Sequence, residues 1–159
     1  MRLRVRTTDA DTEEQHTRAA NLNFSPNSMS YASQTSSYRE MELRSASPER
    51  LVVFVFEQLV INLERARIAM EREDLELRVS ALRRARGLVG ELMATLDFEK
   101  GGRIATQLAD LYQYMMYELV DIGQRGDVVT LRKLVSIATN LRDGFSAAAT
   151  QVVELRKSA

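Results

Sequence analysis

The chain has 159 residues, with 22 basic and 22 acidic side chains, one histidine and no cysteine. Without cysteine there is no disulfide framework and no thiolate chemistry. A formal net charge of zero argues against nucleic-acid binding driven by bulk electrostatics. The longest apolar stretch, residues 51–61, is far shorter than the ~20 residues that span a bilayer, and the first residues lack the apolar core of a secretory signal. We therefore expect a cytoplasmic protein with no nucleic-acid partner and no membrane insertion.

Residues 1–37 differ in composition from the rest of the chain. They are rich in Ser, Thr, Asn and Gln and show no sustained apolar period. Such a segment does not bury enough apolar surface to offset the entropy of ordering it. The composition predicts a disordered N-terminal arm, in which Met29 is a candidate alternative start. Residues 38–157 are expected to form one helical domain.

The first predicted helix begins at Ser47-Pro48-Glu49. The serine oxygen can cap a free N–H, proline suits the first helical position, and glutamate favours the positive end of the helix dipole. The apolar spacing of three and four extends this helix to about Glu71. Its expected core stripe consists of Val52, Val55, Phe56, Leu59, Leu63, Ala66 and Met70.

Three further amphipathic helices follow. Asp74 caps the second, Gly101-Gly102 is expected to end it, the third ends around residues 123–126, and Asp127 caps the fourth. Short turns between long helices make neighbours antiparallel, so the sequence predicts an all-α, up-down four-helix bundle. The expected core stripe of the second helix is Leu75, Leu82, Ala85, Val89, Leu92 and Leu96. That of the third is Ile104, Leu108, Leu111, Tyr112, Met115, Leu119 and Ile122. That of the fourth is Leu131, Leu134, Ala138, Leu141, Phe145, Ala148 and Val152.

The chain offers few residues for chemistry. A di-iron site in a bundle needs Glu-x-x-His pairs, whereas the single histidine, His16, lies in the arm. Glu57 follows six apolar residues, but a lone carboxylate more often faces solvent or pairs with arginine than acts as a buried base. A basic patch on the second helix is interpreted as a solvated helix face; it consists of Arg78, Arg83, Arg84 and Arg86. We expect no enzyme activity, no metal and no cofactor.

Apolar side chains exceed what one core face needs. Beside its stripe the first helix carries Leu51, Phe54, Ile61 and Ile68, and the third carries Tyr114, Met116 and Tyr117. One explanation is that the first helix is buried on two sides. The other is a groove that receives an amphipathic partner helix, for which methionine and tyrosine are well suited.

Three motifs together resemble the FliS family, the flagellar export chaperones that guard flagellin. They are Tyr38-Arg39-Glu40 with residues 46–52 (ASPERLV), residues 91–102 (ELMATLDFEKGG) and residues 111–115 (LYQYM). The similarity covers about residues 29–150. Residues 55–58 replace a Leu-Tyr-Asp-Gly-like tetrapeptide of the family, and residues 142–145 replace an Arg-x-Ala-Trp-like segment, each keeping an aromatic side chain.

The resemblance implies a chaperone that binds the disordered C-terminal segment of flagellin, blocks its premature polymerisation and delivers it to the flagellar export gate. The expected client-contact set is Phe54, Ile61, Tyr112, Tyr114, Met115 and Met116. By the family analogy, the segment from Tyr31 to Tyr38 folds over a client groove and is displaced on binding. Deleting residues 1–40 should then tighten client binding.

Two alternatives stay open. In one, the surplus apolar surface is the interface of a self-associating bundle, an obligate homodimer without a flagellin client; for the chaperone itself we expect a monomer or a weak homodimer. In the other, which ranks last, an enzyme pocket lies beside Glu57.

Overall fold

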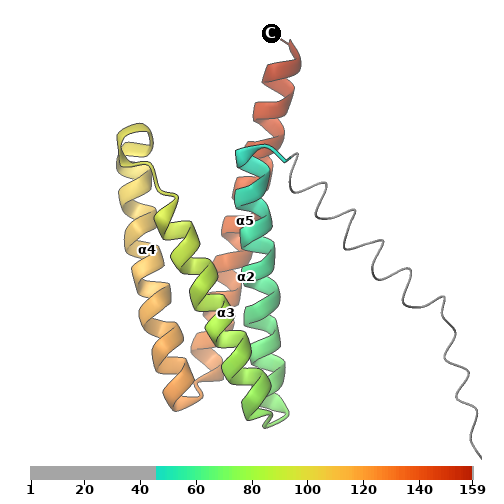
Figure 1. The fold of residues 1–159 in the computed structure, drawn as a ribbon, viewed down its shortest axis with the longest axis vertical. Helices are drawn as coiled ribbons and strands as arrows, with labels where there is room; N and C mark the ends of the chain where they lie inside the picture. Colours follow the sequence, from blue (N-terminus) through green and yellow to red (C-terminus); the bar gives the residue numbers. More distant parts are fainter. Residues whose placement is uncertain (1–45, 159) are drawn as a thin grey trace, which may run out of the picture. The chain divides into compact units, whose positions relative to one another are not determined.

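The structure, a computed structural model, describes residues 46–158. Within them the chain forms four α-helices: α2 (Pro48–Glu71), α3 (Leu75–Ala94), α4 (Phe98–Arg125) and α5 (Val128–Ser158). Each helix runs antiparallel to the next, and α5 closes the ring by packing on α2 (Figure 1). The prediction of an all-α, up-down four-helix bundle is confirmed.

Three of the predicted helix starts are confirmed by their capping geometry. The Ser47 hydroxyl accepts from the Arg50 N–H at 3.5 Å, and the Asp74 carboxylate accepts from the Leu77 N–H at 2.9 Å. Asp127 accepts from two backbone N–H groups at the start of α5, at 2.9 and 3.1 Å. These side chains satisfy donors that a helix start leaves free.

The predicted boundary between the second and third helices is right in part. The break was expected at Gly101-Gly102, but α3 ends at Ala94 and α4 begins at Phe98. Asp97 sets this boundary because its carboxylate accepts at 2.9 Å from the backbone N–H three residues further on. The expected break at Gly101-Gly102 lies inside α4, where Gly102 leaves the helical conformation after the first turn.

The core lies along the bundle axis, and the 3.6-residue spacing predicts most of it. The spacing wrongly places Leu75 in the core. This residue stands in the first turn of α3, at the end of the bundle, and is 62% exposed. Ile104 and Ala148 are also exposed, although both were expected in the core. The buried core cluster consists of Phe56, Leu59, Leu63, Ala66, Ala81, Leu82, Ala85, Val89, Leu92, Tyr112, Met115, Leu119, Ile122, Leu131, Leu134 and Ala138.

Ion pairs join α5 to α2 at both ends of their contact. Arg132 lies 3.5 Å from Glu71, and Arg156 lies 2.9 Å from Glu49. All four side chains are substantially exposed, so each pair contributes little to stability. The pairs lie on the flank of α2 that faces α5.

Candidate functional site

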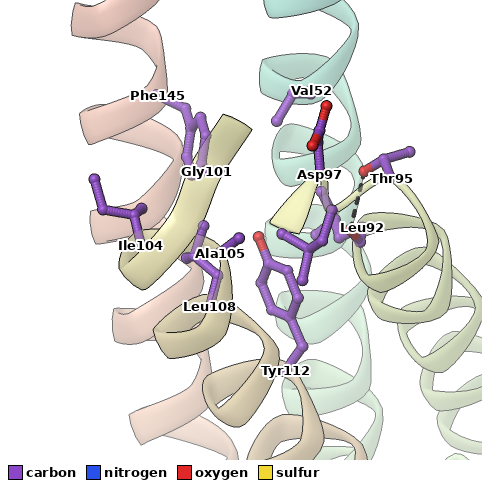
Figure 2. A pocket seen from close by; sticks show the side chains of 11 residues that line it. Val52, Leu92, Thr95, Asp97, Gly101, Ile104, Ala105, Leu108, Tyr112 and Phe145 are labelled. Carbon is purple, nitrogen blue, oxygen red and sulfur yellow. Dashed lines mark hydrogen bonds between the residues drawn. The ribbon is translucent and has the colours of Figure 1, made fainter. Parts of the chain in front are cut away.

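A cavity of about 230 Å³ opens at the end of the bundle where α3 turns into α4 (Figure 2). All four helices contribute to its wall, which is mostly apolar. The residues that line it are Val52, Leu92, Thr95, Leu96, Asp97, Gly101, Ile104, Ala105, Leu108, Tyr112 and Phe145. Its size is suited to a side chain of a partner and falls short of the pockets that enclose drug-sized ligands.

The two glycines of α4 shape the entrance of this cavity. Gly102 has φ 48° and ψ −124°, a backbone conformation that side chains with a Cβ rarely adopt, and it kinks α4 after its first turn. A Cβ on Gly101 would lie 2.8 Å from the Cβ of Ala105, too close for an unstrained contact. The first turn of α4 therefore folds back closely over Ala105 because both positions are glycine.

Tyr112 reaches into the cavity from below, while Ile104 and Leu108 stand at one side (Figure 2). The Tyr112 side chain is 2% exposed, and burial raises its pKa to about 12. The ring packs at a centroid distance of 6.5 Å from Phe56, which in turn stacks on Phe145 at 5.1 Å. At neutral pH the tyrosine is therefore an uncharged hydroxyl on an aromatic floor, and it has no hydrogen-bond partner among the described residues.

Two residues with core spacing are left exposed close to the cavity lining within residues 46–158. Ile104 sits on the core stripe of α4 yet is 68% exposed. Ala148, one turn after Phe145 on α5, is exposed in the same way. This happens because α4 and α5 diverge toward this end of the bundle (Figure 1). We call the surface formed by Ile104, Leu108, Phe145 and Ala148, with the cavity as its floor, the open groove.

Few polar groups stand at the groove, and those present serve the backbone. The Thr95 hydroxyl donates to the Leu92 carbonyl at 2.9 Å, the bond dashed in Figure 2. Asp97 caps α4 and lies 3.5 Å from the Lys100 ammonium. Glu57 is exposed and does not line the cavity, as the solvent-facing interpretation predicted. Within the described residues no three His, Cys, Asp or Glu side chains are placed to share a metal ion.

The structure separates the residues expected to contact a client. Tyr112 lines the cavity, but Met115 is fully buried and offers no surface. Ile61 of α2 is 42% exposed and Tyr114 of α4 is 41% exposed, with α2 and α4 on opposite corners of the helix ring. Phe54 and Met116 are half-buried, and they too lie on α2 and α4. The six residues therefore do not form one patch, and Tyr31 and Tyr38 lie outside the described residues.

Sequence reasoning placed Ile104, Leu108, Phe145 and Ala148 in the core and so missed them as a surface. The available signal was Gly101-Gly102, which was interpreted as a helix break. Two adjacent glycines at the start of a helix also permit a tight turn that leaves space beneath it. The fold and groove define a four-helix-bundle protein whose core is open at the end where α3 turns into α4.

Comparisons with known proteins identify the family of this bundle. Its residues 29–152 match the flagellar protein FliS family. It is 34% identical over 107 residues to the flagellar secretion chaperone FliS of Salmonella typhimurium, covering 67% of this chain and 79% of that protein. It is 31% identical over 106 residues to FliSB of Pseudomonas aeruginosa, covering 67% and 84%. The chain belongs to the FliS family, as its motifs predicted.

A solved structure described as a flagellar chaperone from bacteria has the same fold. The TM-score is 0.62 at 16% identity, and the match covers 79% of this chain and 99% of that one. Membership of a family of secretion chaperones gives this protein a chaperone role in flagellar export, and the family is not one of enzymes. Within residues 46–158 no helix is long and apolar enough to cross a membrane.

Proposed function

We propose that this chaperone binds the C-terminal segment of flagellin in the open groove. The observation that carries the proposal is the exposure of Ile104 and Ala148, which have core spacing but no covering helix. An amphipathic helix laid along α4 and α5 would complete the bundle by supplying the missing apolar face. The cavity would accept one large apolar side chain of that helix, as an anchor below the groove.

The groove suits a client that folds as it binds. Its floor is apolar and almost free of charge, so affinity would come from burial of hydrophobic surface rather than from a few polar contacts. A client segment that is disordered when free loses conformational entropy on binding, and many apolar contacts are needed to offset that loss. Covering this segment in the cytoplasm would keep flagellin from polymerising until the complex reaches the export gate.

Titration calorimetry against a peptide of about 40 residues from the C-terminus of the cognate flagellin tests the proposal, with circular dichroism on the mixture. Saturable binding, a gain of helix and a negative heat-capacity change support it, because apolar burial gives that heat-capacity sign. A folded chaperone that shows no binding to the peptide would contradict it.

A second candidate function, self-association, is favoured by a different observation. The outer face of α2 carries Leu51, 40% exposed, and Ile61, 42% exposed. A homodimer could bury them in an isologous interface. Sedimentation equilibrium with the flagellin peptide absent and present distinguishes the two: a dimer that persists at low concentration and ignores the peptide favours self-association.

A further inference from the structure

The outer surface between α3 and α4 is separate from the open groove. Its position follows from Gly123 of α4, where a Cβ would lie 3.8 Å from the Leu82 side chain of α3. Val120 and Met116, three and seven positions before Gly123, lie on the same flank of α4. On α3, Val79 and Arg86 lie one helical turn before and after Leu82. We call this surface the α3–α4 face; it consists of Val79, Arg83, Arg86, Gly87 and Gly90 of α3 and Met116, Tyr117 and Val120 of α4.

The α3–α4 face carries two arginines, Arg83 and Arg86, one helical turn apart. Five arginines of the bundle form ion pairs within the described residues, namely Arg67, Arg125, Arg132, Arg142 and Arg156. Arg83 and Arg86 have no ion pair or hydrogen bond with a side chain of residues 46–158. Arg83 is exposed and Arg86 half-buried, and neither has a counter-charge among residues 46–158.

The same face exposes apolar surface and bare backbone. Val79 is 44% exposed, Val120 41% and Tyr117 71%. A Cβ built on Gly87 or on Gly90 meets no atom within 4 Å, so no side chain fills the space beside the arginines. A second helix could approach α3 closely there, since small residues let helix backbones come together.

We propose that the α3–α4 face docks an acidic amphipathic helix of a partner protein. The apolar side chain stripe of that helix would cover Val79, Val120 and Tyr117. Its glutamates or aspartates, spaced by three or four residues, would pair with Arg83 and Arg86, which have the same spacing. The two arginines therefore favour a negatively charged partner. The exposed apolar residues favour an amphipathic helix over a polyanion that has no apolar face.

A nucleic acid fits this surface less well. The two free cations span a single turn of α3, about 5 Å at 1.5 Å per residue, whereas a phosphate backbone is bound by charges spread along many nucleotides. The formal net charge of the chain is zero, so there is no broad positive field to add to them.

The test uses the full chain and two designed helical peptides of about 21 residues, long enough for six helical turns. Both carry leucine on one face; one carries glutamate beside it and the other lysine, and binding is followed by fluorescence anisotropy. The charge-reversal variant is Arg83→Glu with Arg86→Glu. The matched control is Arg65→Glu with Arg72→Glu, which makes the same change in net charge at exposed arginines of the α2 side.

We expect the glutamate peptide to bind, and the Arg83/Arg86 variant to weaken it by roughly tenfold, with the control variant within twofold of the parent. The lysine peptide should bind the Arg83→Glu, Arg86→Glu variant more tightly than it binds the parent chain. Equal affinities of the glutamate peptide for parent and variant would overturn the proposal, as would tighter, Arg83-dependent binding of a single DNA strand. If the reversal variant does not fold, Arg83→Gln with Arg86→Gln replaces it.

The flagellin peptide separates this proposal from the chaperone function. Saturating flagellin peptide should leave the glutamate peptide bound, since the groove and the α3–α4 face lie on different flanks of α4. Displacement would mean one shared site and would overturn the inference while leaving client binding intact. If flagellin peptide does not bind at all, the proposed function fails and the α3–α4 face is still tested by the other measurements.

Discussion

Replacing Ile104 with alanine should weaken client binding while leaving the fold intact. Full burial of an isoleucine side chain stabilises by roughly 1.5–3 kcal/mol. Ile104 is 68% exposed in the free chaperone, so about two-thirds of that free energy, roughly 1–2 kcal/mol, remains to be gained when a client covers it. The dissociation constant should therefore rise by about five- to thirtyfold, since each 1.4 kcal/mol is a factor of about ten.

The free energy of unfolding should change much less. Only the buried third of the side chain is lost on truncation, and alanine returns up to about 0.7 kcal/mol through its higher helix propensity. The control is Val129→Ala, an aliphatic side chain that is 65% exposed at the opposite end of the bundle, at the start of α5. Calorimetry with the flagellin peptide and urea denaturation measure the two effects. Binding by Ile104→Ala within twofold of the parent, or an equal loss in Val129→Ala, would refute the reasoning.

Three further predictions concern the cavity and its glycines. Ala105→Leu should fill the cavity and weaken binding of the flagellin peptide by roughly tenfold with a near-parental melting temperature, since about 1–2 kcal/mol of anchor burial is lost; unchanged binding would mean that the cavity holds no anchor. Gly102→Ala should lower the free energy of unfolding by about 1–2 kcal/mol because of its positive φ, while Gly144→Ala, with open space around it, should be neutral or stabilising by up to about 1 kcal/mol; equal effects in urea denaturation would contradict this. Burial raises the Tyr112 pKa to about 12, so the stabilising contribution of the neutral side chain is complete below the unfolded pKa near 10 and is lost as pH rises toward 12. Tyr112→Phe should remove the part of the alkaline loss of stability that comes from this residue. A spectrophotometric titration in which no tyrosine of the folded protein titrates above the ordinary pKa would disprove it.

Local signals predict the architecture well because each acts over a few residues. Ser47, Asp74 and Asp127 accept hydrogen bonds from N–H groups two or three positions away, so the sequence alone places them. Asp97 has the same geometry, but it stands close before a glycine pair that also suggested a boundary. Both signals act there, because Asp97 caps the first turn of α4 and Gly102 leaves the helical conformation directly after that turn.

The groove could not be predicted because periodicity reports that a helix face is apolar, and not what covers it. Ile104 and Ala148 have the spacing of Leu119 and Ala138, yet the first two are exposed and the last two are buried. The difference arises from the divergence of α4 and α5, which is a property of the assembled bundle. A chaperone groove and a core have the same sequence pattern when the missing helix belongs to the client.

The predicted contact residues show the converse limit. Phe54 and Ile61 were chosen as surplus to the core stripe of α2, and both do reach the surface. Met115 was chosen for its position in an aromatic and methionine cluster, but its helical phase places it on the bundle axis with no exposure. Whether any of these side chains touches a client remains a prediction for binding experiments.

One labelling experiment tests most directly whether the client covers the open groove. The chain has no cysteine, so Ala148→Cys introduces a single attachment point for an environment-sensitive fluorophore, and Ser136→Cys on the solvent face of α5 provides the control. Addition of the flagellin peptide should shift the emission of the label at residue 148 to the blue and protect it from quencher, with no change at residue 136. Saturable binding of the peptide with the label at residue 148 unaffected would place the client elsewhere and contradict the account.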